Sequence, residues 1–314
     1  MPKFQAPRGT RDLLPPERAV FLRLEDAARD LATRYGYQPI ETPMFEGSAV
    51  FERGVGEVTD VIEKELFRVQ AGRGEAERER WALRPEPTAG LVRAYVQHGM
   101  RTGPQPVKLT LTGPMFRYDR PQAGRYRQFW QFDVEAIGDA GPGIDAEIIE
   151  LAMAFLAAVG LTDVQVLVNS IGDDVCRPAY VEALASHFRS HHDQLPDLER
   201  ARLETRPMRL LDSKDERMQP LIESAPTITE HLCEACQEHF DGVLAHLAAV
   251  AIEPRLAPTL VRGLDYYTRT AFEFYLPGAE GQQAALGGGG RYDGLVELLG
   301  GQPTPGIGFG IGLD

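Results

Sequence analysis

Apolar residues recur at helical spacing near the amino-terminal end of the chain, and they alternate with polar residues in later segments. The first pattern is carried by Val20, Leu24, Ala27, Ala28, Leu31 and Tyr35. It predicts an amphipathic helix after the segment PRGTRDLLPPE, and the helix is expected to stop at Gly36. The next stretch, YGYQPIETPMFE (residues 35–46), contains Pro39 and Pro43, so a turn and a short extended segment are expected there.

Alternating apolar and polar residues in VKLTLTG (107–113) and FWQFDVEAIG (129–138) predict two strands. The arginine-rich segment between them is longer than a tight turn requires. The two strands are therefore expected to form an antiparallel hairpin whose loop has a function.

Further along, DAEIIELAMAFLAAVGL (145–161) reads as a helix ending at Gly160, and VQVLV (164–168) reads as a strand. Residues 172–254 are dominated by helical patterns, and strand-like segments then return. One helical face in that region is marked by Leu232, Cys236, Phe240, Val243 and Leu247, and the returning strands are expected at 271–276, 287–295 and 306–314. The pattern predicts an α+β fold with a mostly antiparallel sheet flanked by helices. Its catalytic core would be built from residues 1–171 and 255–314, with a helical insertion at 172–254.

Composition agrees with an ordinary globular protein. The chain has 314 residues, of which 43% are hydrophobic and 25% charged, and a net charge of −13. The acidic balance argues against non-specific nucleic-acid binding over the whole surface, although a local basic groove remains compatible with it. Three cysteines are too few for a disulfide framework, and neither a leader nor a membrane span is evident, so a reducing, cytoplasmic location is expected.

Positive charge is nevertheless concentrated in the segment FRYDRPQAGRYRQFWQFDVEAIG (116–138). Its arginines are Arg117, Arg120, Arg125 and Arg127. Asp119 and Asp133 cannot neutralise all of them, so the loop favours an anionic ligand, and Phe129 offers a face for a flat base. A nucleotide fits both features. A solvated loop of surface ion pairs is the alternative reading of this stretch alone.

Other charged groups stand in apolar surroundings. LRPEPTAG (83–90) would place Arg84 and Glu86 on one face if it were a strand, where the carboxylate can bind an ammonium group. Glu135 lies within an apolar strand pattern and needs a polar partner. A further cluster in LVRGLDYYTRTAFEF (260–274) contains Arg262, Asp265, Tyr266 and Tyr267. Taken one at a time, each group fits a structural ion pair as well as a binding site.

The glycine run 287–290 permits close approach of a ligand or a second backbone. It has neither the GxGxxG spacing of dinucleotide-binding folds nor the GK[ST] ending of a P-loop. Both of those nucleotide folds are therefore disfavoured.

Together these segments resemble the class II aminoacyl-tRNA synthetases, and among them the histidyl-tRNA synthetases. YGYQPIETPMFE is similar to the first class II motif, which forms a dimer interface around a proline, here Pro43, and GPMFRYDRPQAGRYRQF is similar to the second motif. LVRGLDYYT and GGGRYDGL resemble the two signatures peculiar to the histidyl enzymes. The resemblance covers essentially the whole chain.

The resemblance implies a role for each matching residue. Catalysis would rest on Arg117 and Arg262, which would hold the ATP α-phosphate from opposite faces. Phe129 would stack on adenine, with Asp119 near its amino group. The histidine-binding set would be Glu86 and Thr88 for the α-amino group, Gln131 for the backbone end, and Glu135, Tyr266 and Tyr267 around the imidazole. The tRNA acceptor end would meet Gln122 and Arg125.

The implied reaction joins histidine to ATP, giving histidyl-adenylate and pyrophosphate, and then transfers histidine to the terminal ribose of tRNA. Mg²⁺ is expected on the phosphates, and positioning with charge neutralisation would supply most of the catalysis. A homodimer is expected from the first motif. The resemblance also implies a third-motif arginine for the γ-phosphate and an anticodon-binding domain beyond Asp314, neither of which is in the sequence.

Two rival interpretations share the fold. One is a synthetase-like regulatory subunit of histidine biosynthesis, although such paralogues tend to lose the LVRGLDYYT signature. The other is an ATP-dependent amide ligase, which would keep the ATP residues but not the pair Glu135 and Tyr267.

The segment HLCEACQEH (231–239) resembles a zinc motif, with His231, Cys233, Cys236 and His239 as candidate ligands. On one helix these side chains would diverge, and zinc sites usually draw on two separated pairs. A packed helix is therefore the favoured interpretation, and no metal ligand is assigned. His191 and His192 are expected at the surface.

Overall fold

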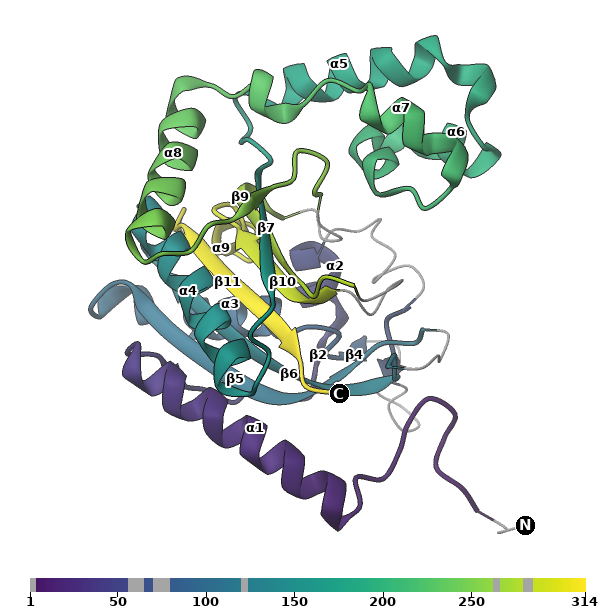
Figure 1. Ribbon diagram of the computed structural model, residues 1–314. Coiled ribbons are helices and arrows are strands. Elements are labelled where there is room, and N and C mark those ends of the chain that lie inside the picture. The colour runs from purple at the N-terminus through teal and green to yellow at the C-terminus, as the bar shows by residue number, and fades with distance from the viewer. Residues whose placement is uncertain (1–3, 56–64, 70–79, 120–123, 262–265, 279–284) are drawn as a thin grey trace.

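The computed structural model describes residues 4–55, 65–69, 80–119, 124–261, 266–278 and 285–314. Its centre is an eight-stranded sheet in the order β1-β5-β6-β11-β10-β9-β7-β8 (Figure 1). The strands are β1 (Gln38–Pro39), β5 (Val107–Phe116), β6 (Gln128–Ile137), β7 (Gln165–Ser170), β8 (Arg255–Leu256), β9 (Thr268–Tyr275), β10 (Ala285–Arg291) and β11 (Gly306–Gly312). Neighbouring strands are antiparallel except β1–β5 and β7–β8 at the two edges. The predicted α+β fold with a mostly antiparallel sheet is confirmed.

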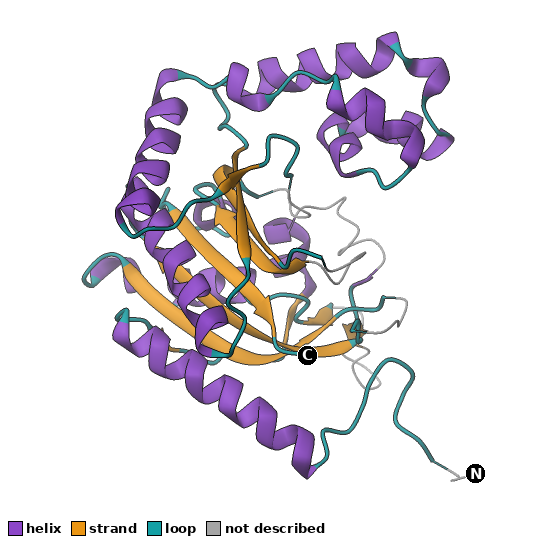
Figure 2. Cartoon of the chain, in the orientation of Figure 1, coloured by secondary structure: helices purple, strands orange, loops and turns teal. Residues whose placement is uncertain are grey.

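Helices cover both faces of this sheet (Figure 2). The core on one face joins side chains of α1 (Pro15–Arg34), α4 (Pro142–Ala158) and α8 (Glu234–Ala249) to β6, β7, β9 and β11. The opposite face carries α3 (Thr88–Gln97) and α9 (Leu295–Leu298), which pack on Ile137 and on each other. Nearby, α2 (Ser48–Val55) packs against a three-stranded sheet of β2 (Phe45–Gly47), β4 (Trp81–Leu83) and β3 (Arg68–Val69).

The alternation along β6 divides its side chains between the two faces. Phe132, Val134 and Ala136 enter the core beneath α1 and α4. The intervening Asp133 and Glu135 are also buried, but on the face that carries α3. The strand thus presents acids toward α3 while its apolar side chains anchor it from behind.

The predicted hairpin is confirmed: β5 pairs with β6 from Val107 opposite Ile137 to Phe116 opposite Gln128. Three boundaries differ from the prediction. Helix α1 begins at Pro15, which occupies the first helical turn where proline's missing N–H costs nothing. Strand β10 ends at Arg291 rather than continuing to residue 295, where α9 begins. Strand β4 ends at Leu83, so Arg84 and Glu86 lie in the connection to α3 and not on a strand.

Between β7 and β8 the chain is mainly helical. It contains α5 (Arg177–Ser190), α6 (Asp197–Thr205) and α7 (Gln219–Glu223), followed by α8. Short 3-10 turns in this stretch lie at η3 (His192–Gln194), η4 (Pro207–Asp212), η5 (Glu216–Met218) and η6 (Ile228–Glu230), and another, η2 (Met100–Thr102), lies between α3 and β5. Residues of α5, α6 and α7 form a separate hydrophobic cluster, whereas Phe240, Val243 and Leu247 of α8 join the main core. The division at residues 172 and 254 stays a prediction.

Among the helices of the described ranges, none combines the length and the apolar character that a membrane crossing requires.

Candidate active site

Glycines in β11 make room for the acids of β6. Gly308 is paired with Glu135 and Gly310 with Asp133 across the antiparallel ladder. A Cβ atom added at Gly308 would overlap the Glu135 carboxylate, and one at Gly310 would lie 2.5 Å from Asp133 Oδ1. These glycines therefore leave space above the sheet that the two carboxylates fill. We call the surroundings of these acids the acidic hollow.

Glu135 is held by two hydroxyl donors. The Thr88 hydroxyl donates to Oε1 at 2.6 Å, and the Tyr292 hydroxyl donates to Oε2. Burial raises the pKa of Glu135 to about 8, because the desolvation of the carboxylate outweighs these two hydrogen bonds, and the negative charge of Glu86 adds to the rise. Glu135, the residue predicted to bind the imidazole ring, is thus a buried acid in a fixed orientation.

Glu86 is fastened to the beginning of α3. Its Oε2 accepts the backbone N–H of Thr88 at 2.8 Å, and its Oε1 accepts that of Ala89 at 3.0 Å. These bonds satisfy free amides at the positive end of the helix dipole. Burial still raises the pKa of Glu86, although the hydrogen bonds and the positive charge of Arg117 oppose the rise. Because a carboxylate has about four lone-pair sites, both oxygens retain capacity to accept an ammonium group.

Asp133 completes a group of three buried acids. Burial, followed by the charges of Glu135 and Glu86, raises its pKa well above the ordinary value. Its Oδ2 atom and the Oε1 atom of the neighbouring Gln131 are buried and have no hydrogen-bond partner within the described part of the chain. Unpaired polar atoms of this kind are rare in native interiors and indicate a position that a ligand can occupy.

Aromatic rings form one wall of the hollow. The Tyr266 and Tyr267 ring centroids lie 4.7 Å apart, and those of Tyr266 and Tyr292 lie 5.9 Å apart. Tyr267 and Tyr292 are buried. Gly290 leaves space for the Tyr267 ring, since a Cβ there would lie 2.7 Å from Cδ1 of that ring. The predicted pair Tyr266 and Tyr267 thus lies beside the acids, together with Tyr292.

Next to the acids, the end of the β5–β6 hairpin carries the predicted nucleotide residues. The Arg117 guanidinium lies 5.3 Å from the centre of the Phe129 ring, and its Nε donates to the Pro85 carbonyl at 2.9 Å. Asp119 forms an ion pair with Arg125. The arrangement offers a positioned cation and an aromatic face beside the acidic hollow.

Some predicted residues lie elsewhere. Arg262 and Gln122 fall outside the described residues. Arg84 is buried, but it binds backbone, donating to the Pro114 carbonyl at 3.0 Å and to the Thr42 carbonyl at 2.9 Å. Arg84 also pairs with Glu41 at 3.1 Å, so it ties the first motif to β5. Its buried Nη2 atom has no hydrogen-bond partner within the described residues, and its positive charge opposes the rise in the pKa of Asp133.

Tyr292 and Asp133 were not predicted as site residues. Tyr292 lies within the signature GGGRYDGL, and that match is the signal that identifies it. Arg291, beside it, is fully buried and ion-paired with Asp145, and it also donates to the Asp139 carbonyl at 2.9 Å. This buried network fixes the backbone that carries Tyr292.

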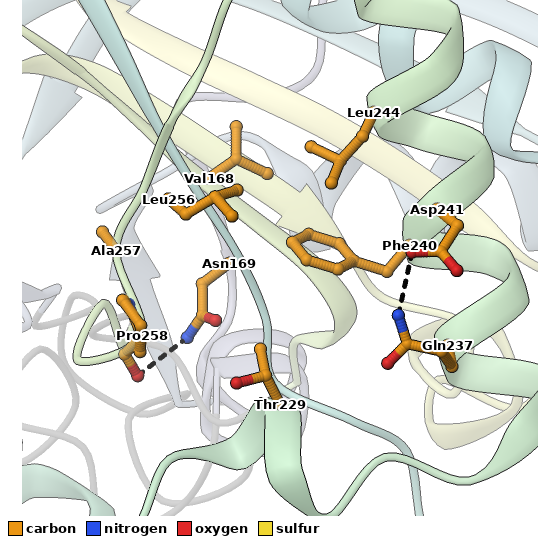
Figure 3. A pocket seen from close by; sticks show the side chains of 10 residues that line it. All are labelled: Val168, Asn169, Thr229, Gln237, Phe240, Asp241, Leu244, Leu256, Ala257 and Pro258. Atoms are coloured by element: carbon orange, nitrogen blue, oxygen red, sulfur yellow. Dashed lines mark hydrogen bonds between the residues drawn. The ribbon is translucent and has the colours of Figure 1, made fainter.

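A cavity of about 260 Å³ lies away from these residues, between β7, β8, η6 and α8 (Figure 3). Asn169 at its wall donates to the Pro258 carbonyl at 3.2 Å, and Gln237 donates to Asp241 at 2.8 Å. The wall amides are thus paired within the protein, in contrast to Gln131 in the acidic hollow.

A twisted antiparallel sheet that holds an acid-lined hollow beside an arginine and an aromatic ring is the catalytic architecture of the class II aminoacyl-tRNA synthetases. The histidyl-tRNA synthetase family profile matches residues 9–314. The chain belongs to the histidyl-tRNA synthetase family.

Individual relatives agree with this assignment. A histidine–tRNA ligase of Desulforudis audaxviator is 50% identical over 98% of this chain and 72% of its own length. One of Mycobacterium marinum is 48% identical over 100% of this chain and 73% of its own length. The solved structure of apo histidyl-tRNA synthetase from S. aureus has a TM-score of 0.78 at 38% identity, covering 99% of this chain and 72% of that one.

Proposed function

We propose that this chain acts as a histidine–tRNA ligase whose acidic hollow binds histidine and whose Arg117 and Phe129 bind ATP. The histidine carboxylate attacks the α-phosphate of ATP, and pyrophosphate leaves. A hydroxyl of the terminal ribose of tRNA then attacks the histidyl carbonyl of the resulting adenylate, and AMP leaves.

The observation that carries the proposal is the mutual crowding of Glu86, Asp133 and Glu135. Each has a raised pKa because of burial, and the neighbouring acids raise the pKa values of Asp133 and Glu135 further. A ligand that brings an ammonium group relieves this repulsion, which favours an amino acid over a neutral ligand. We assign imidazole as the second polar group of the amino acid. Glu135 and the tyrosines offer hydrogen-bonding groups beside aromatic rings, which suit a flat ring with polar atoms.

Within this hollow we assign the α-amino group to Glu86 and Thr88 and the carboxylate end to Gln131, whose buried Oε1 has no hydrogen-bond partner within the described residues. Glu135 and Tyr267 bind the two imidazole nitrogens, and Tyr266 supports the Tyr267 ring at a centroid distance of 4.7 Å. A side chain without polar atoms on both sides would leave one of these buried groups unpaired, which disfavours it strongly.

ATP is assigned to the end of the hairpin. Arg117 neutralises the α-phosphate, Phe129 stacks on adenine, and Asp119 lies near the adenine amino group. Arg262 acts from the opposite face, and Mg²⁺ enters with ATP on its phosphate oxygens. Removing one such cation from a phosphoryl-transfer site costs several kcal/mol of transition-state stabilisation.

The partners and location follow the same family assignment. Gln122 and Arg125 contact the tRNA acceptor end, and the chain works in the cytoplasm as a homodimer. The dimer proposal is supported by the exposed apolar residues Met44 and Phe45 next to Pro43, which are 47% and 50% exposed. Apolar surface of this kind at the first motif favours burial against a second copy.

Histidine-dependent ATP–pyrophosphate exchange tests the activation step. Exchange should occur with histidine and not with phenylalanine or glutamine, and Arg262→Ala should abolish it without abolishing histidine binding. Binding of histidine with no exchange by the parent chain would point either to a need for the third-motif arginine beyond Asp314 or to a regulatory subunit, and adding the downstream residues would separate the two. Exchange supported equally by several amino acids would contradict the assigned hollow.

A further inference from the structure

Three cysteines and one aspartate, far apart in the sequence, meet at the base of the helical segment. They are Asp173, Cys176, Cys233 and Cys236. Their three sulfur atoms and one carboxylate oxygen all lie within 4.8 Å of one another. Ligands arranged tetrahedrally around zinc, at the usual Zn–S and Zn–O distances, are about 3.5 to 3.8 Å apart. The observed Asp173 Oδ1 separations of 3.5 Å from Cys176 Sγ and 3.9 Å from Cys233 Sγ are close to that geometry.

The four residues form two separated pairs with the same spacing. Asp173 and Cys176 precede α5, and Cys233 and Cys236 lie at the start of α8. A pair with two intervening residues from each of two chain segments is the usual construction of a structural zinc site. Two of the four residues weighed in the sequence, His231 and His239, lie outside this group. His231 binds the Thr227 carbonyl at 3.1 Å, and the buried His239 binds Asp145 at 3.1 Å.

The local backbone is shaped to bring these groups together. Gly172 has a φ of +65°, and a Cβ there would lie 2.8 Å from Cys176 Sγ. This turn lets Asp173 Oδ1 accept the N–H of Val175 at 3.1 Å and hold the start of α5. Cys176 and Cys233 are the residues that cap α5 and α8, so two helix amino-termini point their positive dipole ends at the sulfurs.

Two arginines supply the remaining charge balance. A zinc ion with three thiolates and one carboxylate carries two net negative charges. Arg269 contacts Asp173 Oδ2 at 3.4 Å, and Arg177 lies close enough to Cys176, Asp173 and Cys236 for Coulombic interaction. The surroundings therefore stabilise the site with metal bound.

We propose that Asp173, Cys176, Cys233 and Cys236 bind one structural zinc ion that fastens the two ends of the helical segment together. The site would also support Tyr267, which belongs to the signature LVRGLDYYT. Arg177, which follows Cys176 directly, donates to the Tyr267 carbonyl at 2.8 Å, and the Gly172 carbonyl accepts the N–H of Arg269 at 2.7 Å. Three thiolates with one oxygen favour zinc over magnesium or calcium, which prefer all-oxygen sites.

The test is metal analysis of the full chain purified without chelators and under reducing conditions. One zinc ion per chain is expected, and replacement with Co²⁺ should give the visible absorption of a tetrahedral site with a thiolate-to-cobalt band. Cys233→Ser should lose the metal and the band, and Asp173→Asn should bind zinc at least about tenfold more weakly. His231→Gln is the matched control, since it removes a neighbouring histidine of the rejected ligand set and should keep the full metal content.

Three results would overturn the proposal. The first is a parent chain without zinc that also gives no cobalt band. The second is zinc content that is unchanged in both Cys233→Ser and Asp173→Asn, or that is lost equally in His231→Gln. The third is a disulfide among the cysteines that persists in the chain isolated under these reducing conditions, seen as a mass two hydrogens lower than after denaturation and full reduction. Circular dichroism identifies a variant that fails to fold, and Asp173→Asn, which keeps all three thiols, then decides.

Discussion

Replacing Glu135 with glutamine should make the protein more stable at alkaline pH while making it a poorer enzyme. Burial raises the pKa of this carboxyl from 4.5 to about 8. Between those two values the folded protein holds a proton that the unfolded chain has lost, so stability falls as the pH rises. The destabilisation begins near the unfolded pKa and is complete above the folded pKa. Glutamine has nearly the same shape and does not titrate, so the variant lacks this loss.

The size of the effect follows from the pKa difference, which corresponds to on the order of 3 to 5 kcal/mol for a fully buried group. Urea unfolding at pH 5 and pH 9 measures it. The free energy of unfolding of Glu135→Gln, relative to the parent, should rise by about that amount between the two pH values. The control is Glu297→Gln, which makes the same change at a solvent-exposed position. A gain in this control equal to that of Glu135→Gln would show that burial is not the cause.

The same substitution should lower kcat/KM for histidine in the exchange assay. A hydrogen bond to a charged or strongly polar partner contributes about 1.5 to 3 kcal/mol, which predicts a loss of roughly 10- to 150-fold. If the stability of Glu135→Gln relative to the parent is the same at pH 5 and pH 9, the claim that burial raises the pKa of the Glu135 carboxyl is refuted. Unchanged activity would refute its assignment to the imidazole.

Three further predictions test the surroundings of this residue. Gly308→Ala should destabilise the fold by about 1 to 3 kcal/mol in urea and abolish exchange, because its Cβ overlaps Glu135, whereas Gly312→Ala, with no atom within 4 Å, should do neither. Arg291→Met should lower the free energy of unfolding by about 3 to 5 kcal/mol because Asp145 loses its buried cation, while the surface change Arg189→Met should cost less than about 1 kcal/mol. Histidine binding at pH 7 should release protons, because its ammonium group lowers the pKa of Glu135 from about 8; calorimetry in buffers of different ionisation enthalpy would detect this, and net proton uptake would contradict it.

Sequence reasoning worked where local pattern determines structure. The alternation in residues 107–113 and 129–138 was sufficient to predict the β5–β6 hairpin, and the acids of β6 stood out because a buried strand rarely contains them. Glu86 was correctly singled out as a buried carboxylate, but its fastening to α3 was missed. The proline-containing LRPEPTAG gives a weak helix signal, and the amides that Glu86 accepts become available only once α3 forms.

Contacts between residues far apart in the sequence are harder to predict. Cys233 and Cys236 are two of the four residues in the proposed zinc site. The other candidate ligands in the segment HLCEACQEH are histidines. The second pair precedes α5, at the other end of the helical segment, and it meets the first pair only because the fold brings the start of α8 back to the start of α5. Similarly, the role of the β11 glycines in making room for Glu135 and Asp133 follows only from the strand register, which the sequence does not give.

These pairings explain how the fold keeps three acids in one hollow. Burying each carboxylate costs folding free energy, and the repulsion between carboxylates raises that cost. Each one is nevertheless held by a helix or strand that is stabilised by other contacts. Glu86 is tied to α3, Glu135 to Thr88 and Tyr292, and Asp133 extends from a strand anchored by apolar side chains on its other face. The cost of burying these acids is therefore offset by the rest of the sheet, and it falls when a cationic amino acid binds. On this reasoning a variant that removes the repulsion gains stability and loses selectivity for histidine together, because both properties depend on the same buried carboxylates.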